Sequence, residues 1–332
     1  MERLELLPTH QYKQGHVSMT ASSDRTATLD GLPVDQAVDV VDDETTDLDT
    51  VRETLGIVAQ DGIVCRAGVD DALANASKVV MTAETRVEFA GNKLDDVREV
   101  AASVPDLDLV SVRLSEFADR LAAIETRADG LGDAVQDALD LKAEGELYAA
   151  AQRIRQLTTA ATEVQRAADD FQFELDAVEP WLTDGDRRAE ELAADVDAVA
   201  ASVDELAAIV DSIERDDAGS DTEAAHTWVG ATVRHRVVSL LIADLRAELA
   251  ALRTWAERVD ETPPSGIESR IDDLQASHEA VGERLDTCAD PAWSTRFDEQ
   301  LAALDEELER IEPPVSWLDV EAVVEEYRPV AE

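Results

Sequence analysis

The sequence predicts an all-α fold, on three observations. Apolar residues recur at alternating steps of four and three, which places them on one narrow stripe of a helix. Prolines and glycines divide these stretches, and the links between them are short, which favours antiparallel neighbours. We therefore expect long antiparallel helices packed as coiled-coil bundles, with a small N-terminal helical module. The clearest stripe consists of Leu107, Val110, Leu114, Phe117, Leu121, Ile124, Ala128, Leu131, Val135 and Ala138.

The first 30 residues differ from the rest of the chain. Residues 1–18 carry no net charge, and residues 19–30 are small and polar. Such a composition cannot bury enough apolar surface to fold, so we expect residues 1–30 to be a disordered tail. The acidic bias begins only after Met19, which makes Met19 a candidate natural start.

Residues 31–82 predict a small module of short helices, similar in size to a helix-turn-helix. Pro33 suits the first position of a short helix, and further helices are expected over residues 48–58 and 67–81. Between them, Asp61-Gly62 predicts a turn into the apolar pair Ile63-Val64.

Longer helices follow, in two further regions. Residues 83–216 predict a long-helix antiparallel coiled-coil bundle, with helices 106–143, 146–182 and 185–215 as a three-helix unit. Residues 217–332 predict a second helical unit that ends in a short C-terminal helix. The rival arrangement is an extended parallel homodimer, and the sequence leaves monomer and homodimer open.

The charge of the chain is strongly acidic. It has 75 Asp and Glu against 29 Lys and Arg, a net charge of −46 spread over almost all segments. Such an excess destabilises a compact state by self-repulsion unless salt screens it, and at molar salt the Debye length falls to about 3 Å. We therefore expect a halophilic protein. No apolar run approaches the ~20 residues that span a bilayer, and the start has no apolar signal core, so we expect a cytoplasmic location without membrane contact.

The motifs of catalysis and cofactor binding are missing from the sequence. No phosphate-binding loop, nucleophile elbow or zinc-protease motif is present. Glu223 and His226 have the Glu-x-x-His spacing of di-iron bundles, but such sites need two copies and two further Glu. His278 lies on a helix stripe, which predicts a polar core residue. We expect no enzyme, no catalytic residue, no metal and no cofactor.

Two sets of residues are candidates for partner binding. A DNA-reading role for residues 31–82 would use Arg52, Arg66, Lys78 and Arg86. DNA affinity depends mainly on phosphate neutralisation, and residues 31–100 hold six basic against sixteen acidic residues, so we expect no nucleic-acid partner. Trp317 and Leu318, which follow two prolines, are candidates for anchoring a protein partner.

Three features of the chain together resemble a known group of proteins. They are the short-helix module, the acidic helices with heptad stripes that follow it, and the sequence of residues 31–38, Gly-Leu-Pro-Val-Asp-Gln-Ala-Val. The chain resembles haloarchaeal acidic coiled-coil proteins called halo transducer proteins. The resemblance implies kinship with the cytoplasmic coiled coils of halobacterial taxis transducers. The stretch that is most similar to a transducer methylation site, residues 190–195, ends in Asp195, where transducers carry Ser or Thr.

Three functional hypotheses follow from the sequence. The first is a non-enzymatic cytoplasmic coiled-coil scaffold or adaptor that binds an unknown protein partner through helix faces. The second is a DNA-binding transcriptional regulator that uses residues 31–82. The third is a soluble accessory of transducer-type taxis signalling.

Overall fold

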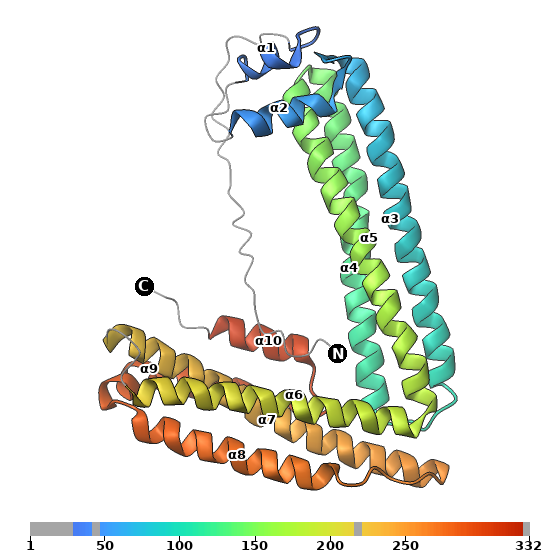
Figure 1. The fold of residues 1–332 in the computed structure, drawn as a ribbon. Helices are drawn as coiled ribbons and strands as arrows, with labels where there is room; N and C mark the ends of the chain where they lie inside the picture. Colours follow the sequence, from blue (N-terminus) through green and yellow to red (C-terminus); the bar gives the residue numbers. More distant parts are fainter. Residues whose placement is uncertain (1–28, 42–46, 216–220, 328–332) are drawn as a thin grey trace. The chain divides into compact units, whose positions relative to one another are not determined.

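The computed structural model describes residues 29–41, 47–215 and 221–327 (Figure 1). These residues form ten α-helices and one two-stranded hairpin. The prediction of an all-α fold is therefore confirmed. The expected disordered tail, with the candidate start Met19, lies almost wholly outside the described residues.

The N-terminal elements are short. Helix α1 spans Val34–Val38 and helix α2 spans Leu48–Ile57. The side chain of Asp47 caps α2, because its Oδ1 accepts hydrogen bonds from the backbone N–H groups of Asp49 and Thr50. This capping by a carboxylate satisfies amide groups that have no partner within the helix.

A tight hairpin links α2 to the first long helix. Strands β1 (Ala59–Gln60) and β2 (Ile63–Val64) pair across the predicted Asp61-Gly62 turn, and both turn residues have positive φ. Two positive φ values are typical of the turns that join short hairpins. After the hairpin, a Cβ at Gly68 would lie 2.2 Å from the carbonyl oxygen of Val58. Glycine is therefore required where the long helix passes the end of α2.

The helices α3 (Arg66–Ala101), α4 (Asp108–Glu144) and α5 (Leu147–Thr183) lie side by side (Figure 1). Their interior is apolar and holds many alanines, and it includes the rings of Phe117 and Phe171, whose centroids are 5.7 Å apart in an edge-to-face contact. Alanine positions bring helix backbones close together, and the two rings fill the space that remains.

Ion pairs record how α3 meets α5. Arg86 pairs with Asp169 at 3.5 Å, and Lys93 pairs with Asp176 at 2.8 Å. The partners in both pairs are 83 positions apart, and the two pairs are seven residues apart along each helix. Helices α3 and α5 therefore run parallel, and they keep the same offset in residue number over a heptad.

The contact between α4 and α5 follows the opposite sense. Arg120 pairs with Glu174 at 2.5 Å, and Arg127 pairs with Glu163 at 3.5 Å. The residue numbers rise on α4 as they fall on α5, as the short link between these helices requires.

The C-terminal part of the chain contains helices α6 (Gly185–Glu214), α7 (Asp221–Val259), α8 (Ile267–Cys288), α9 (Pro291–Leu308) and α10 (Trp317–Glu326). Helices α6, α7 and α8 pack against one another, α9 contacts α7, and α10 contacts α9 (Figure 1). Most of the buried apolar side chains of this part belong to α6, α7 and α8.

Ion pairs also record how α6 meets α8. Arg270 pairs with Asp197, and Arg284 pairs with Asp211. The partners in both pairs are 73 positions apart, and the two pairs are two heptads apart. Helices α6 and α8 thus also run parallel with a constant offset in residue number, as α3 and α5 do.

Contacts divide the chain into two units. One unit, called the α3 unit, comprises Phe117–Ala177 and the described residues before Glu99. The other, called the α6 unit, comprises Glu99–Glu116 and the described residues from Val178 onward.

The expected helix over 146–182 is present as α5, which ends at Thr183, where Asp184 caps α6. Two other expectations need correction. No helix ends at residue 82, because α3 is one helix from Arg66 to Ala101, so the expected helix over 67–81 and the stretch after it are continuous. The expected three-helix unit joined α4, α5 and α6, whereas α6 packs with α7 and α8. A stripe shows that a helix buries one face but does not show which neighbour covers it.

Candidate functional site

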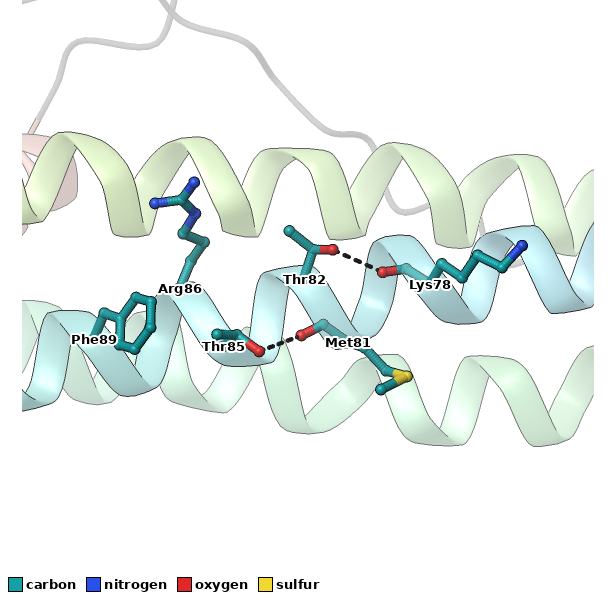
Figure 2. A pocket seen from close by; sticks show the side chains of 6 residues that line it. All are labelled: Lys78, Met81, Thr82, Thr85, Arg86 and Phe89. Carbon is teal, nitrogen blue, oxygen red and sulfur yellow. Dashed lines mark hydrogen bonds between the residues drawn. The ribbon is translucent and has the colours of Figure 1, made fainter.

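The most distinctive surface of the α3 unit lies along the outside of α3 (Figure 2). Six side chains of this helix line an open groove of about 460 Å³, which we call the α3 stripe. They form two adjacent rows, each with a spacing of four residues, as neighbouring positions on a helix surface do. One row is Met81, Thr85 and Phe89, and the other is Lys78, Thr82 and Arg86.

The first row is apolar and exposed to solvent. Met81 has 65 % of its surface exposed and Phe89 has 50 %. Between them, the hydroxyl of Thr85 donates a hydrogen bond to the carbonyl oxygen of Met81 at 2.8 Å. Because this hydroxyl is satisfied within the helix, its methyl group is the part of Thr85 that a partner would meet. The row therefore offers a continuous apolar edge about two turns long.

The second row carries positive charge. Arg86 extends from α3 toward α5 (Figure 2). There it pairs with Asp169, and Lys78 donates a hydrogen bond to the neutral side chain of Asn75 at 3.2 Å. No Asp or Glu lines the α3 stripe. A second groove, between α2, α3 and α5, also has no carboxylate among its lining residues. In a chain with 75 acidic residues, the linings of these two grooves are free of carboxylates, whereas Glu84 and Glu88 are exposed on α3 beside the first row.

The structure separates the four bases considered for DNA contact. Lys78 and Arg86 lie together in the α3 stripe. Arg52 lies on α2, where Asp35 and Asp49 pair with it at 3.2 Å and 2.8 Å. Arg66 begins α3 and lies 3.8 Å from Asp30. Three of the four bases thus face a carboxylate within the chain, which leaves little positive charge for phosphates.

Trp317 and Leu318 begin α10. Their side chains lie outside the described part of the structure, so their predicted partner contact stays a prediction. The buried cluster next to them consists of Val237, Val315 and Val320. Asp244, which is buried on α7, accepts a hydrogen bond from the backbone N–H of Val315 at 2.9 Å and holds the start of this segment.

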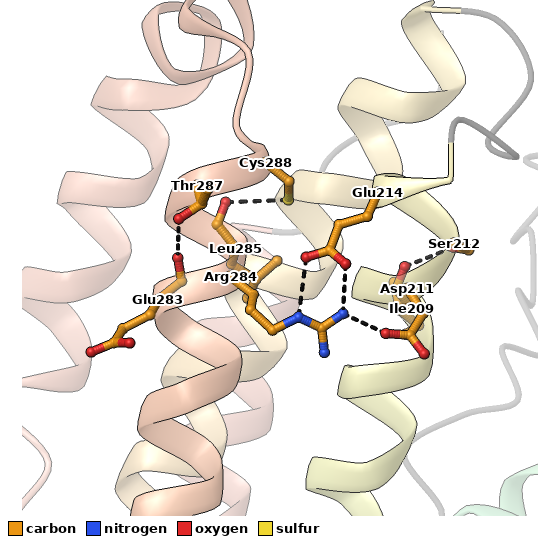
Figure 3. A network of polar contacts seen from close by, with 9 residues as sticks. All are labelled: Ile209, Asp211, Ser212, Glu214, Glu283, Arg284, Leu285, Thr287 and Cys288. Carbon is orange, nitrogen blue, oxygen red and sulfur yellow. Dashed lines mark hydrogen bonds and ion pairs between the residues drawn. The ribbon is translucent and has the colours of Figure 1, made fainter.

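A polar network joins α6 to α8 in the α6 unit (Figure 3). The guanidinium of Arg284 donates to both carboxylate oxygens of Glu214, at 3.1 Å and 2.8 Å, and to Asp211. These hydrogen bonds hold the pKa of the Glu214 carboxyl below its usual range and raise the pKa of Arg284. Nearby, burial raises the pKa of the Cys288 thiol, so this sulfur stays protonated and is a poor nucleophile.

Two tryptophans and two arginines form a second cluster in the α6 unit. The rings of Trp181 and Trp255 meet edge to face at 5.6 Å. The guanidinium of Arg188 lies 4.0 Å from the centre of the Trp255 ring, and that of Arg113 lies 4.3 Å from the centre of the Trp181 ring. Arg188 is almost fully buried and pairs with Glu261 at 3.0 Å. These contacts pack the end of α5 and the start of α6 against α7.

Sequence reasoning missed the apolar row of the α3 stripe. The heptad stripe of α3 passes through Val80, Val87 and Leu94, all of which are buried. Met81 and Phe89 stand outside that stripe, and a large apolar residue away from the buried face is the signal that would have found them.

Two further observations concern membranes and metals. Among the described helices, none combines the length and the apolar character that crossing a bilayer demands. Within the same described ranges, no three or more His, Cys, Asp or Glu side chains gather as ligands of a metal ion would.

No family model matches this chain, and neither a curated protein nor a solved structure shows significant similarity to it.

Proposed function

We propose that the chain is a non-enzymatic cytoplasmic scaffold or adaptor that binds a protein partner through the α3 stripe. The observation that carries this proposal is the exposure of Met81 and Phe89 in a groove whose six lining residues include Lys78 and Arg86 and no carboxylate, in a chain of net charge −46. Exposed apolar patches on folded proteins mark interaction sites more often than scattered single residues do.

The proposed scaffold consists of antiparallel coiled-coil bundles. Support for the antiparallel sense comes from α4 and α5, where Arg120 pairs with Glu174 and Arg127 pairs with Glu163, so that residue numbers rise on one helix as they fall on the other. Support for the coiled coil comes from ion pairs that recur at heptad intervals between helices that run parallel: the pairs of Arg86 and Lys93 are seven residues apart, and those of Arg270 and Arg284 are fourteen apart. Pairs that flank the apolar seam of a coiled coil set the register and orientation of its helices.

The proposed partner is an amphipathic helix with acidic flanks. The apolar row from Met81 to Phe89 spans eight residues, or about 12 Å at 1.5 Å per residue. Two apolar side chains seven or eight positions apart on a partner helix match this length. Lys78, whose ammonium donates to the neutral side chain of Asn75, lies beside the row, and its charge favours a carboxylate at the edge of that helix.

Affinity capture from a native lysate at high salt tests this proposal. The bait is the full chain, the test variant is Met81→Ser with Phe89→Ser, and the matched control is Phe173→Ser, which removes an apolar side chain that is 78 % exposed on α5. Mass spectrometry compares the captured proteins. We expect the double variant to lose one partner by about tenfold or more, as a loss of 1.4 kcal/mol implies, and the control to retain it.

Two further results sharpen the test. Lys78→Glu weakens capture of the same partner, and a peptide from that partner with apolar residues seven or eight apart and acidic flanks competes for the site. Equal capture of the same proteins by the full chain, the double variant and the control would contradict the proposal.

The other two hypotheses stay predictions and give different outcomes in the same capture. A DNA-binding regulator would co-purify with DNA, and the association would depend on Arg66 and Lys78 and be lost after nuclease treatment. A taxis accessory would capture a taxis kinase or coupling protein.

A further inference from the structure

Two histidines form a stacked pair between α7 and α8. The rings of His235 and His278 are nearly parallel, with an angle of 8° between their planes and 3.8 Å between their centres. Each ring also reaches the backbone of the other helix: Nε2 of His235 lies 3.1 Å from the carbonyl oxygen of His278, and Nε2 of His278 lies 2.9 Å from the carbonyl oxygen of His235. The contact is thus reciprocal.

This geometry fixes the protonation of both rings. A carbonyl oxygen only accepts, so each Nε2 must carry the hydrogen, and in the neutral ring each Nδ1 carries none. The Nδ1 of His278 is buried without a hydrogen-bond partner. A proton added there would have no acceptor, and two protonated rings would place like charges 3.8 Å apart. The contact therefore suits two neutral rings.

The surroundings of the pair leave it little room to adjust. His278 is 3 % exposed. A Cβ at Gly282 would lie 2.7 Å from Nε2 of His235, so the absence of a side chain at this position of α8 makes room for the ring. One heptad away along both helices, the indole N–H of Trp228 donates to the carbonyl oxygen of Leu285 at 3.1 Å. Side chains thus bind the opposite backbone at two successive heptads.

Charged groups surround the pair on every helix packed against it. On α7, Arg234 and Arg236 flank His235. They pair with Glu205 of α6 and Asp305 of α9. On α8, the carboxylates of Glu279 and Asp286 favour protonation of His278 and His235 respectively. Burial opposes these carboxylates and is the stronger influence, so the pKa of both rings is lowered, and that of His235 is lowered further by His278.

We propose that the stacked pair of His235 and His278 is an acid-sensitive contact between helices. It holds α7 against α8 while both rings are neutral, and it breaks when the rings are protonated. The sign follows from linkage. On acidification the unfolded chain takes up protons at these positions before the folded chain does, so stability is complete above the usual histidine range and falls as the pH drops through it.

Thermal unfolding of the full chain at fixed high salt tests whether the contact of His235 with His278 makes stability depend on pH. The melting temperature, followed by circular dichroism, is compared at about pH 7.5 and about pH 5.5, on either side of the usual histidine pKa. The test variant is His235→Phe with His278→Phe, which keeps two aromatic rings and removes the titration. The matched control is His226→Gln, which alters a histidine of α7 outside the pair.

We expect the wild type and the control to lose about 3 °C or more between the two pH values, as a change of about 1 kcal/mol implies. The double variant is expected to lose clearly less, whatever its starting stability. Gly282→Ala, which displaces the ring without removing a titrating group, also reduces the loss. Equal losses in all four proteins would overturn the proposal.

Nuclear magnetic resonance of the wild type gives a second reading that needs no variant. Nitrogen shifts of the two rings should show hydrogen on Nε2 at neutral pH, and their protonation should coincide with loss of contacts between α7 and α8. Protonation of both rings with these contacts retained would overturn the proposal as well.

Discussion

The two units differ in which side chains they expose and bury: the α3 unit exposes large apolar residues, and the α6 unit buries polar ones. Of the eight large apolar residues that the described part of the chain exposes, seven belong to the α3 unit and one, Val259, to the α6 unit. Of the six buried polar or charged residues there, five belong to the α6 unit and one, Thr54, to the α3 unit. Both units nevertheless keep one ion-pair register over heptads. Similar helix packing thus accompanies two different surfaces, and the exposed apolar residues of the α3 unit are the ones that offer contact to a partner.

The largest expected effect is the loss of a buried ring. Phe171→Ala in the α3 unit and Trp255→Ala in the α6 unit should each cost about 3–5 kcal/mol, since both side chains are buried and no neighbour can fill the cavity completely. All five tryptophans of the chain lie at or after Trp181. Tryptophan fluorescence therefore reports on the α6 unit, whereas circular dichroism reports on both.

Denaturant unfolding followed by both probes separates the two units. Phe171→Ala should move the circular dichroism transition more than the fluorescence transition. Equal movement of both transitions would show that the two units unfold together and do not differ in their free energies of unfolding.

The buried arginine of the α6 unit gives the next largest effect. Arg188 donates to the carbonyl oxygens of Trp181 and Leu182 at 3.1 Å and 3.2 Å and lies over the Trp255 ring. Arg188→Met should cost about 2–3 kcal/mol, because charged hydrogen bonds and a desolvated cation–π contact are lost together. The neighbouring Arg187 is exposed, so Arg187→Met should cost under about 0.5 kcal/mol. Denaturant unfolding of both variants measures the difference, and similar costs would contradict the assigned role of Arg188.

The salt dependence of stability distinguishes the contribution of the ion pairs from that of the net charge. Ion pairs on the surface strengthen as salt is removed, but each is worth only about 0–1 kcal/mol. Repulsion among an excess of 46 negative charges strengthens at the same time. We expect repulsion to dominate, so the melting temperature should fall when the salt is lowered from molar to tenth-molar concentration. A melting temperature that rises would show that the ion pairs outweigh the repulsion.

The smallest expected effect on stability is at the α3 stripe. Phe89→Ser should change the free energy of unfolding by no more than about 0.5 kcal/mol beyond the cost of helix propensity, because half of the ring faces solvent. Val87→Ser, two positions earlier on the buried face, should cost clearly more. Denaturant unfolding compares the two variants. A large loss from Phe89→Ser would mean that this ring stabilises the fold and is not held available for a partner.

Local signals account for the parts of the fold that the sequence predicted. The pair Asp61-Gly62 forms the predicted turn, with positive φ at both residues. The continuation of α3 through residue 82 was missed because the last short helix was expected to end at residue 81, although no proline or glycine stands there to end it. Pairing among helices was also wrong in part, since every stripe is apolar and none specifies its neighbour.

The candidate sites were less predictable for the same reason. His278 was expected in the core and is buried there, but its stacking on His235 depends on a register between α7 and α8 that no single helix encodes. Lys78 and Arg86 were singled out for their charge, whereas the apolar row beside them depends on which face of α3 its neighbours leave uncovered.

Site-specific photo-crosslinking tests the central claim, that the α3 stripe binds a protein partner, most directly. A photoreactive phenylalanine analogue replaces Thr85 in the middle of the stripe, or Phe173 on α5 as the control, and the chain is irradiated in native lysate at high salt. The account predicts a specific cross-linked protein from position 85 that is absent from position 173 and lost when Phe89→Glu is added. Cross-linking that is equal at both positions, or unchanged by Phe89→Glu, would contradict it.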